Sequence, residues 1–357
     1  MLRERLGGGG IGSRLMSHDL SEPAPAEELR ARLRLRLKPA DLVERYALLA
    51  VWGVVCLVFG ILRPNTFPTL DNFSAMFGSQ AVLVVLTLAL LVPLTAGDYD
   101  LSVAANLTLS AMVLGVLNVN RHWPIGWAIV AALGVGALVG FINGGLVVLL
   151  GIDSLIVTLG TSTFVAGVVY WISSTNVSGI SNTLVNGVVV DTLFHIPLEF
   201  YYGLALCVVM WYVFEFTPLG RRLLFVGRGR SVARLSGIRV GRLRWGALVA
   251  AGLISACAGI LNAGTAASAD PTSGLQLLLP AFAAAFLGAT SIVPGRFNPI
   301  GSLVAVYFLV TGINGLQQLG VETFVQQLFY GGALILAVAV SQIAHRREAS
   351  ETGTGGY

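Results

Sequence analysis

Long apolar runs are the feature that most constrains this chain of 357 residues. A bilayer core is about 30 Å thick, so a helix that crosses it needs about 20 mostly apolar residues. Ten runs of about that length, bounded by charges, Pro or Gly, lie near residues 46–62, 74–96, 101–118, 125–150, 155–172, 198–216, 245–263, 274–291, 299–316 and 323–342. The second and eighth runs hold many small or polar residues that can break a helix. We therefore expect an all-α polytopic membrane protein with about ten transmembrane helices.

Composition supports the membrane assignment. Hydrophobic residues make up 55% of the chain and charged residues only 11%, which is typical of polytopic membrane proteins. A transmembrane barrel would need short alternating segments, and the unbroken run from Trp127 to Leu150 does not alternate. Cys56, Cys207 and Cys257 each lie inside an expected span without metal-ligand spacing, so we interpret them as packing residues.

The basic residues indicate the orientation. With the N-terminus in the cytoplasm, 20 of the 22 Lys and Arg residues fall on inside segments, and only Arg63 and Arg121 fall outside. Cytoplasmic loops of membrane proteins carry such an excess of positive charge. Both termini are therefore expected in the cytoplasm. The net charge of +4 then reflects topology, and without a soluble basic domain it does not indicate a nucleic-acid partner.

This orientation divides the chain into segments. We expect residues 1–45 to form a cytoplasmic, partly disordered tail, with a possible surface helix at residues 27–38. Residues 46–342 form the transmembrane domain, and residues 217–244 form a cytoplasmic loop within it. Residues 343–357 form a second cytoplasmic tail. The longest outside loop, at 173–197, is long enough to meet a soluble partner or is simply a solvated surface.

Several chemistries are disfavoured. The only lysine, Lys38, stands outside any phosphate-binding G-x-x-x-x-G-K-[ST] pattern, so we expect no ATPase site in this chain. No cofactor or metal site is expected either, because all four histidines lie in tails or loops. The carboxylates near the spans fall at helix ends rather than inside the spans, which weakens the case for an ion-coupled carrier. Backbone carbonyls can also hold sodium, so that class stays open.

An internal repeat is visible in two short segments. Asn143-Gly144, followed by residues 151–156, matches Asn314-Gly315, followed by residues 320–325, in chemical type at each position. The copies lie five spans apart, which reverses their direction through the membrane and predicts an inverted repeat of spans 2–5 and 7–10. Asp153, Ser154, Glu322 and Thr323 are expected to cap the helices that follow.

Three further segments carry a resemblance to a known family. Residues 96–103 read A-G-D-Y-D-L-S-V, residues 143–161 include N-G and S-L-I-V-T-L-G-T, and residues 269–291 run from A-D-P to F-L-G-A-T-S. With the 217–244 loop, they resemble the permeases of bacterial ABC importers of the ribose, xylose and galactose type. The chain departs from that pattern at Asp98, Tyr99, Ala104 and residues 292–299, where bulk or charge replaces small residues.

The resemblance implies a transport subunit of the inner membrane rather than an enzyme. Its implied partners are a cytoplasmic ATPase that binds ATP, an external solute-binding protein, a second permease copy and a sugar-like solute. It also implies a pathway at the dimer centre, and the polar residues near mid-membrane are Asn106, Thr108, Ser110, Thr158 and Thr161. Each of these equally suits a hydrogen bond to a neighbouring helix.

The 217–244 loop is expected to couple the permease to the ATPase. Ser231 is a good helix N-cap and Gly237 a good stop, so a short helix fits between them. In the family this segment docks in a groove of the ATPase. The residues expected to couple are Gly220, Arg221, Ser231, Ala233, Arg234, Leu235, Ser236 and Gly237. Gly229-Arg230-Ser231 stands where members often carry Asn-Glu-Glu, which reverses the local charge. Attraction of the arginines to anionic lipid is the other interpretation.

The sequence thus predicts the permease of an ABC importer, with an ion-coupled secondary carrier as the alternative. The solute itself is not readable, because the binding protein selects it.

Overall fold

The computed structural model describes residues 39–322 and 324–351, with side chains described for 45–322 and 324–339. The chain divides into two compact units, Met1–Leu42 and Val43–Tyr357. The surface helix expected at residues 27–38 lies outside the described residues.

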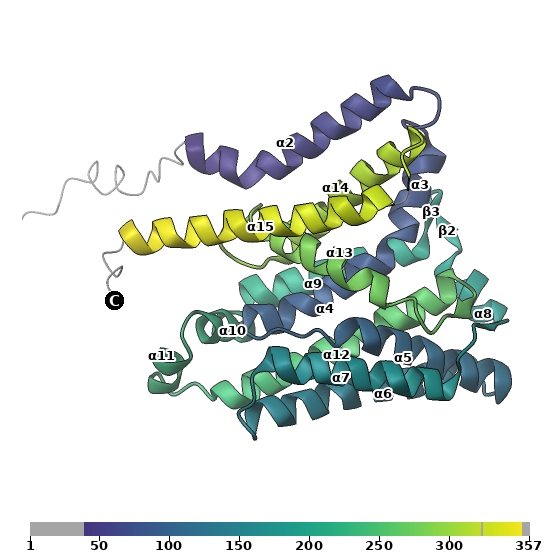
Figure 1. Ribbon diagram of the computed structural model, residues 1–357, viewed down its shortest axis with the longest axis horizontal. Coiled ribbons are helices and arrows are strands. Elements are labelled where there is room, and N and C mark those ends of the chain that lie inside the picture. Colours follow the sequence, from purple (N-terminus) through teal and green to yellow (C-terminus); the bar gives the residue numbers. More distant parts are fainter. Residues whose placement is uncertain (1–38, 323, 352–357) are drawn as a thin grey trace, which may run out of the picture. The chain divides into compact units, whose positions relative to one another are not determined.

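Helices make up most of the described chain (Figure 1). They are α2 (Pro39–Leu62), α3 (Leu70–Ser79), α4 (Ala81–Thr95), α5 (Val103–Gly115), α6 (Ile125–Val148), α7 (Ser154–Ile172), α8 (Asn182–Leu184), α9 (Leu198–Phe216), α10 (Pro218–Arg228), α11 (Arg230–Leu235), α12 (Val240–Thr265), α13 (Leu275–Gly288), α14 (Pro299–Gln318) and α15 (Phe324–Glu351). Two π-helical turns, η1 (Val116–Asn120) and η2 (Val185–Val189), follow α5 and α8. Strand β1 (Val177–Ser178) pairs antiparallel with β4 (Ser268–Ala269), and β2 (Thr192–Leu193) pairs with β3 (Ile196–Pro197).

A helix lies at each of the ten expected spans, but not all are long enough to cross a bilayer. In the described part of the chain, seven helices qualify by length and hydropathy, and the bent pair α3–α4 makes an eighth. The pair bends by 41° at its junction. With 14 residues, α13 is about 21 Å long. These are the second and eighth runs, where small and polar residues raised the expectation of a break.

The centre of the helical unit is α4. Every residue of this helix is buried, and it contacts α9, α12 and α13. A helix that is apolar on every side except for two threonines can be accommodated only where other helices surround it. By contrast, α7 exposes large apolar side chains such as Phe164 and Trp171, as a surface that faces lipid would.

The long helix α12 packs against α4, α5 and α6 (Figure 1). A Cβ atom on Gly252 would collide with the Gly136 carbonyl of α6, and one on Gly136 would meet the Gly252 carbonyl in turn. Glycines at both positions therefore let the two backbones meet, as small residues commonly do between transmembrane helices. With 26 residues, α12 spans about 39 Å.

The expected outside loop, residues 173–197, is structured. Its strand β1 pairs with β4, which follows the C-terminal end of α12. Its backbone is also fixed at Ser181, whose N–H donates to the Asn118 side chain at 2.9 Å. The loop therefore lies at the end of α12 opposite to its first residue, Val240.

Candidate functional site

The connection between α4 and α5 forms the core of the site. Residues 96–102 are non-helical, and Gly97 has a φ of +79°, a left-handed conformation that favours glycine. The Asp98 N–H donates to the Pro93 carbonyl at 2.9 Å. This sharp turn carries Asp98 away from the α4 axis and towards α11 and α12.

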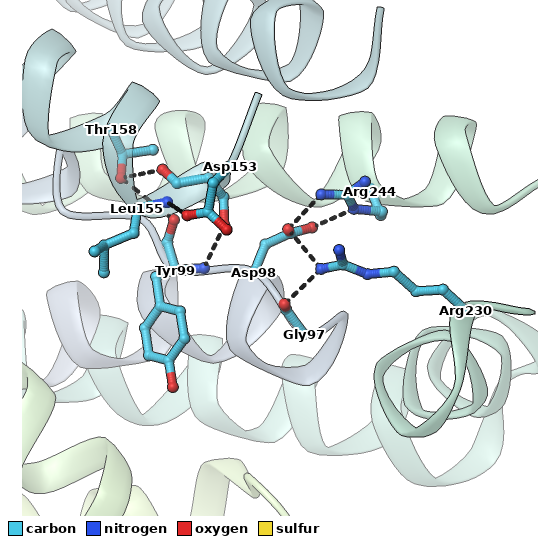
Figure 2. A network of polar contacts seen from close by, with 9 residues as sticks. Gly97, Asp98, Tyr99, Asp153, Leu155, Thr158, Arg230 and Arg244 are labelled. Atoms are coloured by element: carbon cyan, nitrogen blue, oxygen red, sulfur yellow. Dashed lines mark hydrogen bonds and ion pairs between the residues drawn. The ribbon is translucent and has the colours of Figure 1, made fainter. Parts of the chain in front are cut away.

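Asp98 is held by two arginines (Figure 2). Arg244, near the start of α12, donates to both carboxylate oxygens at 2.7 and 2.6 Å. Arg230, the first residue of α11, donates to Oδ1 at 2.9 Å and to the Gly97 carbonyl at 2.6 Å. The Asp98 side chain is 1% exposed, against 13% for Arg244 and 44% for Arg230.

Close backbone packing brings Arg230 to this position. A Cβ atom on Gly227, near the end of α10, would collide with the Thr95 carbonyl at the end of α4. Glycine at this position lets α10 approach the α4 terminus, and α11 begins only three residues later. The short helix α11 is thereby fixed to the transmembrane bundle by both packing and charge.

On the opposite side of the turn, hydroxyl groups of α7 accept hydrogen bonds from the backbone (Figure 2). The Tyr99 N–H donates to the Ser154 hydroxyl at 3.1 Å, and the Leu101 N–H donates to the Thr158 hydroxyl at 3.1 Å. Thr158 in turn donates to the Tyr99 and Ser154 carbonyls. Backbone N–H groups that are shielded from water outside a helix need such partners. The turn therefore connects α4, α5, α7, α11 and α12.

A second carboxylate, Asp100, lies within the same turn. Its Oδ1 accepts from the Ser102 N–H at 2.9 Å and from the Ser102 hydroxyl at 2.6 Å. The Asn143 amide of α6 donates to that hydroxyl at 2.8 Å. Burial raises the pKa of Asp100 to about 6, because desolvation disfavours the charged form.

Four of the five predicted pathway residues make hydrogen bonds to neighbouring segments. Asn106 donates to the Gly136 and Gly252 carbonyls and to Ser255, and Ser110 donates to the Ala132 carbonyl. The Thr108 hydroxyl accepts from the Gly274 N–H at 3.0 Å, and Thr158 belongs to the turn described above. All four are buried, so in this structure they bond helices together.

Thr161 differs from these four. It is half-buried and lines a groove between α5, α6 and α7 whose other walls are apolar, including Leu109 and Phe164. The structure thus does not gather the five residues around one cavity, and their contact with solute stays a prediction.

The predicted coupling residues divide into buried and exposed sets. Gly220 lies against the Phe214 backbone, and Ala233 is fully buried in a small cluster with Val226 and Val240. Arg221, Arg234, Ser236 and Ser231 are exposed, and Leu235 is 90% exposed. One side of α11 therefore holds the helix to the protein, while the other offers an apolar side chain among arginines.

The helix ends partly confirm the expected caps. Gly237 has a φ of +79°, and the Ile238 N–H bonds back to the Ala233 carbonyl at 3.1 Å, so the stop signal is confirmed. The Ser231 cap is wrong: α11 starts at Arg230 with Gly229 as its N-cap.

The caps expected at the repeat also have mixed outcomes. Asp153 caps α7 by accepting from the Leu155 N–H at 2.9 Å, as expected. Ser154 instead binds the Tyr99 N–H. At Glu322, the backbone carbonyl rather than the side chain accepts a hydrogen bond from the Val325 N–H. Thr323 lies outside the described residues.

Two of the three members of the charge network stood out in the sequence, whereas Arg244 and the network itself did not. Asp98 and Arg230 both stood out as departures from the family pattern, one adding a negative charge and the other reversing a negative charge to positive. The structure pairs them. The signal for this pairing was the presence of two departures of opposite charge in one chain, since either charge alone would lack a partner.

The chain matches the family described as "Branched-chain amino acid transport system / permease component" over residues 72–338. The D-allose transport system permease protein AlsC of Escherichia coli (strain K12) is 29% identical over 301 residues, covering 84% of this chain and 92% of that protein. No solved structure matches the chain.

Two further relatives are similar over the same extent. The autoinducer 2 import system permease protein LsrD of Photorhabdus laumondii is 30% identical over 311 residues, covering 84% of this chain and 91% of the relative. The galactose/methyl galactoside import permease protein MglC of Haemophilus influenzae is 26% identical over 319 residues, covering 84% and 95%.

Proposed function

The chain belongs to the family of branched-chain amino acid transport system permease components. We propose that it is the permease subunit of an ABC importer for a sugar or sugar-like solute. The observation that carries the proposal is similarity along most of the chain to permeases of allose, autoinducer 2 and galactose import. These relatives give no support to the ion-coupled carrier.

We infer a division of labour among subunits. The chain is a multi-pass protein of the inner membrane and provides the route for solute. A cytoplasmic ATPase hydrolyses ATP, and an external binding protein delivers the solute to a pair of permease copies. The exposed side of α11, with Leu235 and its neighbouring arginines, supports an ATPase-docking role for the 217–244 segment. Anchoring to lipid acts at the same surface.

We propose that ten helices cross the membrane, with both termini in the cytoplasm. The bent pair α3–α4 counts as one crossing, and α13 and α15 complete the set. Support comes from the two ends of α12. Its first turns hold Arg244 and follow the arginine-rich segment 217–244, whereas its last residue, Thr265, precedes β4, which pairs with β1 of the 173–197 loop. The arginines then lie inside and that loop outside.

We further propose that spans 2–5 and 7–10 are inverted repeats. Gly151 and Gly320, which align in the two copies, both have positive φ, at +70° and +83°. Asp270 accepts from the Thr272 N–H and hydroxyl, which repeats the pattern of Asp100 and Ser102. These two turns come just after α12 and just after α4, as an offset of five spans requires.

The orientation predicts a labelling pattern. A cysteine placed at Asn182, in the outer loop, should react with a membrane-impermeant thiol reagent in intact cells. A cysteine at Gly229 should react only after permeabilisation. Mass-tag gel shifts on a background with Cys56, Cys207 and Cys257 replaced by alanine measure both reactions. The reverse pattern would contradict the orientation.

The division of labour predicts an inactive chain in isolation. Purified in lipid without other subunits, it should hydrolyse no ATP above background, because it lacks a phosphate-binding loop with a lysine. Addition of the cognate ATPase should produce hydrolysis that is stimulated by the solute-loaded binding protein. Colorimetric phosphate release measures this, and turnover by the chain alone would refute the proposal.

A further inference from the structure

A cavity of about 490 Å³ lies at the end of α12 remote from Asp98. Its lining comes from the α3–α4 junction, the C-terminal ends of α12 and α14, and the first turns of α13 and α15. At the other ends of α4 and α12 stand Gly97 and Arg244 of the charge network. In the proposed orientation, the cavity therefore belongs to the outer half of the permease.

The polar groups of this cavity are of one kind. Six amide side chains line it, namely Gln80, Asn262, Gln276, Asn314, Gln317 and Gln326, together with the hydroxyls of Ser79, Thr265 and Tyr330. None of the described lining residues carries a charge. The Thr265 hydroxyl also donates to the buried Glu199 carboxylate, and Glu199 does not itself line the cavity.

A bent helix pair and a helix that contains proline form two of the walls. The 41° bend between α3 and α4 falls at Gln80, and α13 contains Pro280. Since proline has no N–H, the Gln276 carbonyl one turn earlier loses its intrahelical partner. Irregular backbone at membrane depth is tolerated where it lines a cavity, and broken helices commonly form the solute sites of transporters.

We propose that this cavity, within a single permease copy, is a binding site for a neutral polyhydroxylated solute such as a monosaccharide. The inference rests on the proposed importer function. Sugar hydroxyls both donate and accept hydrogen bonds, and a carboxamide side chain offers both a carbonyl oxygen and an NH₂ group. Leu83, Leu277 and Ile313 supply apolar surface for the C–H faces of the ring. The volume lies within the range of small-molecule pockets, about 300–1,000 Å³.

The uncharged lining also decides between two solute classes. A zwitterionic amino acid would bring a carboxylate and an ammonium into a site of low dielectric, where oppositely charged side chains would hold them best. The polar side chains of the described lining are amides and hydroxyls, and none carries such a charge. We therefore assign the cavity to sugars rather than to the amino acids that appear in the family description.

Adjacent glutamines provide a matched test. Gln326 lines the cavity, whereas Gln327 is exposed and does not appear in its walls. In the full-length permease in lipid nanodiscs, saturation-transfer NMR should detect D-allose or D-galactose but not L-leucine. Gln326→Leu and Gln317→Leu should each weaken sugar binding about tenfold, the effect of one lost hydrogen bond to a buried polar group. Gln327→Leu should bind as the wild type does.

A second measurement does not depend on the folding of these variants. Either sugar should slow thiol labelling of Ser79→Cys, which lies in the cavity, and leave labelling of Asn182→Cys unchanged. Unaltered binding by both cavity variants, equal protection at both cysteines, binding of L-leucine instead of the sugars, or no binding of either sugar would each overturn the proposal.

Uptake by the complete importer separates this inference from the proposed function. ATP-driven uptake of a sugar that the isolated permease does not bind would overturn the cavity site and leave the importer assignment intact. Sugar binding lost in the cavity variants, without any ATP-driven uptake, would support the site and contradict the importer.

Discussion

Replacement of Asp98 by asparagine is expected to destabilise the permease by about 3 kcal/mol and to abolish uptake, because it breaks a buried ion pair and leaves Arg244 without its partner. The carboxylate is 1% exposed and accepts three hydrogen bonds from the two arginines. The change conserves volume, so the loss measures charge and hydrogen bonding rather than a cavity. Thermal unfolding of the purified protein and uptake in cells provide the two measurements.

The two arginines should differ in their effects. Arg244→Gln should cost more stability than Arg230→Gln, because Arg244 is the less exposed and makes two of the three hydrogen bonds to the carboxylate. The double variant Asp98→Asn/Arg230→Gln should be less damaging than the sum of the single changes, since the residues interact directly. Asp71→Asn, on the exposed first turn of α3, is the control. Additive effects, or a stable Asp98→Asn protein, would contradict the network.

Replacement of Ala233 by proline is expected to abolish association with the ATPase, and uptake with it. The Ala233 N–H donates to the Gly229 carbonyl at 2.9 Å, and its side chain is fully buried between α10 and α12. Proline removes that bond and clashes with the preceding turn, at a cost of about 3 kcal/mol. A helix of six residues has no cooperative reserve against this cost. Co-purification of the ATPase with membrane-inserted permease measures the loss.

Two further variants separate docking from anchoring. Leu235→Ser removes an exposed apolar side chain and should weaken ATPase association while leaving the permease fold intact. Charge reversal of Arg239 and Arg242, downstream of α11, should have less effect on association if these residues attract lipid. Normal ATPase binding and uptake by both Ala233→Pro and Leu235→Ser would show that residues 217–244 only anchor the protein.

The positions of the helices were predictable, because twenty apolar residues in a row have few alternatives. The helix lengths were less so. The small and polar residues of the run at 74–96 indicated a break, but hydropathy could neither place it before Ala81 nor give the 41° bend between α3 and α4. Helix α10 was not predicted, because its sequence is basic and amphipathic rather than continuously apolar.

The site was less predictable than the fold. Spacing along one helix could suggest that Asn106 and Ser110 share a face, but not that their neighbours would be the Gly136 and Ala132 carbonyls. The pairing of Asp98 with Arg230 joins residues more than 130 positions apart. Such contacts follow from the packing of Gly227 against Thr95, which no local pattern contains.

Reconstitution tests the central claim most directly. Proteoliposomes would contain the permease alone or with its cognate ATPase, with ATP enclosed and the labelled solute presented outside on its binding protein. We expect uptake only when the ATPase, ATP and binding protein are all present, and no dependence on a sodium or proton gradient. Uptake by the permease alone, driven by either ion gradient, would contradict the importer and identify the chain as a secondary carrier.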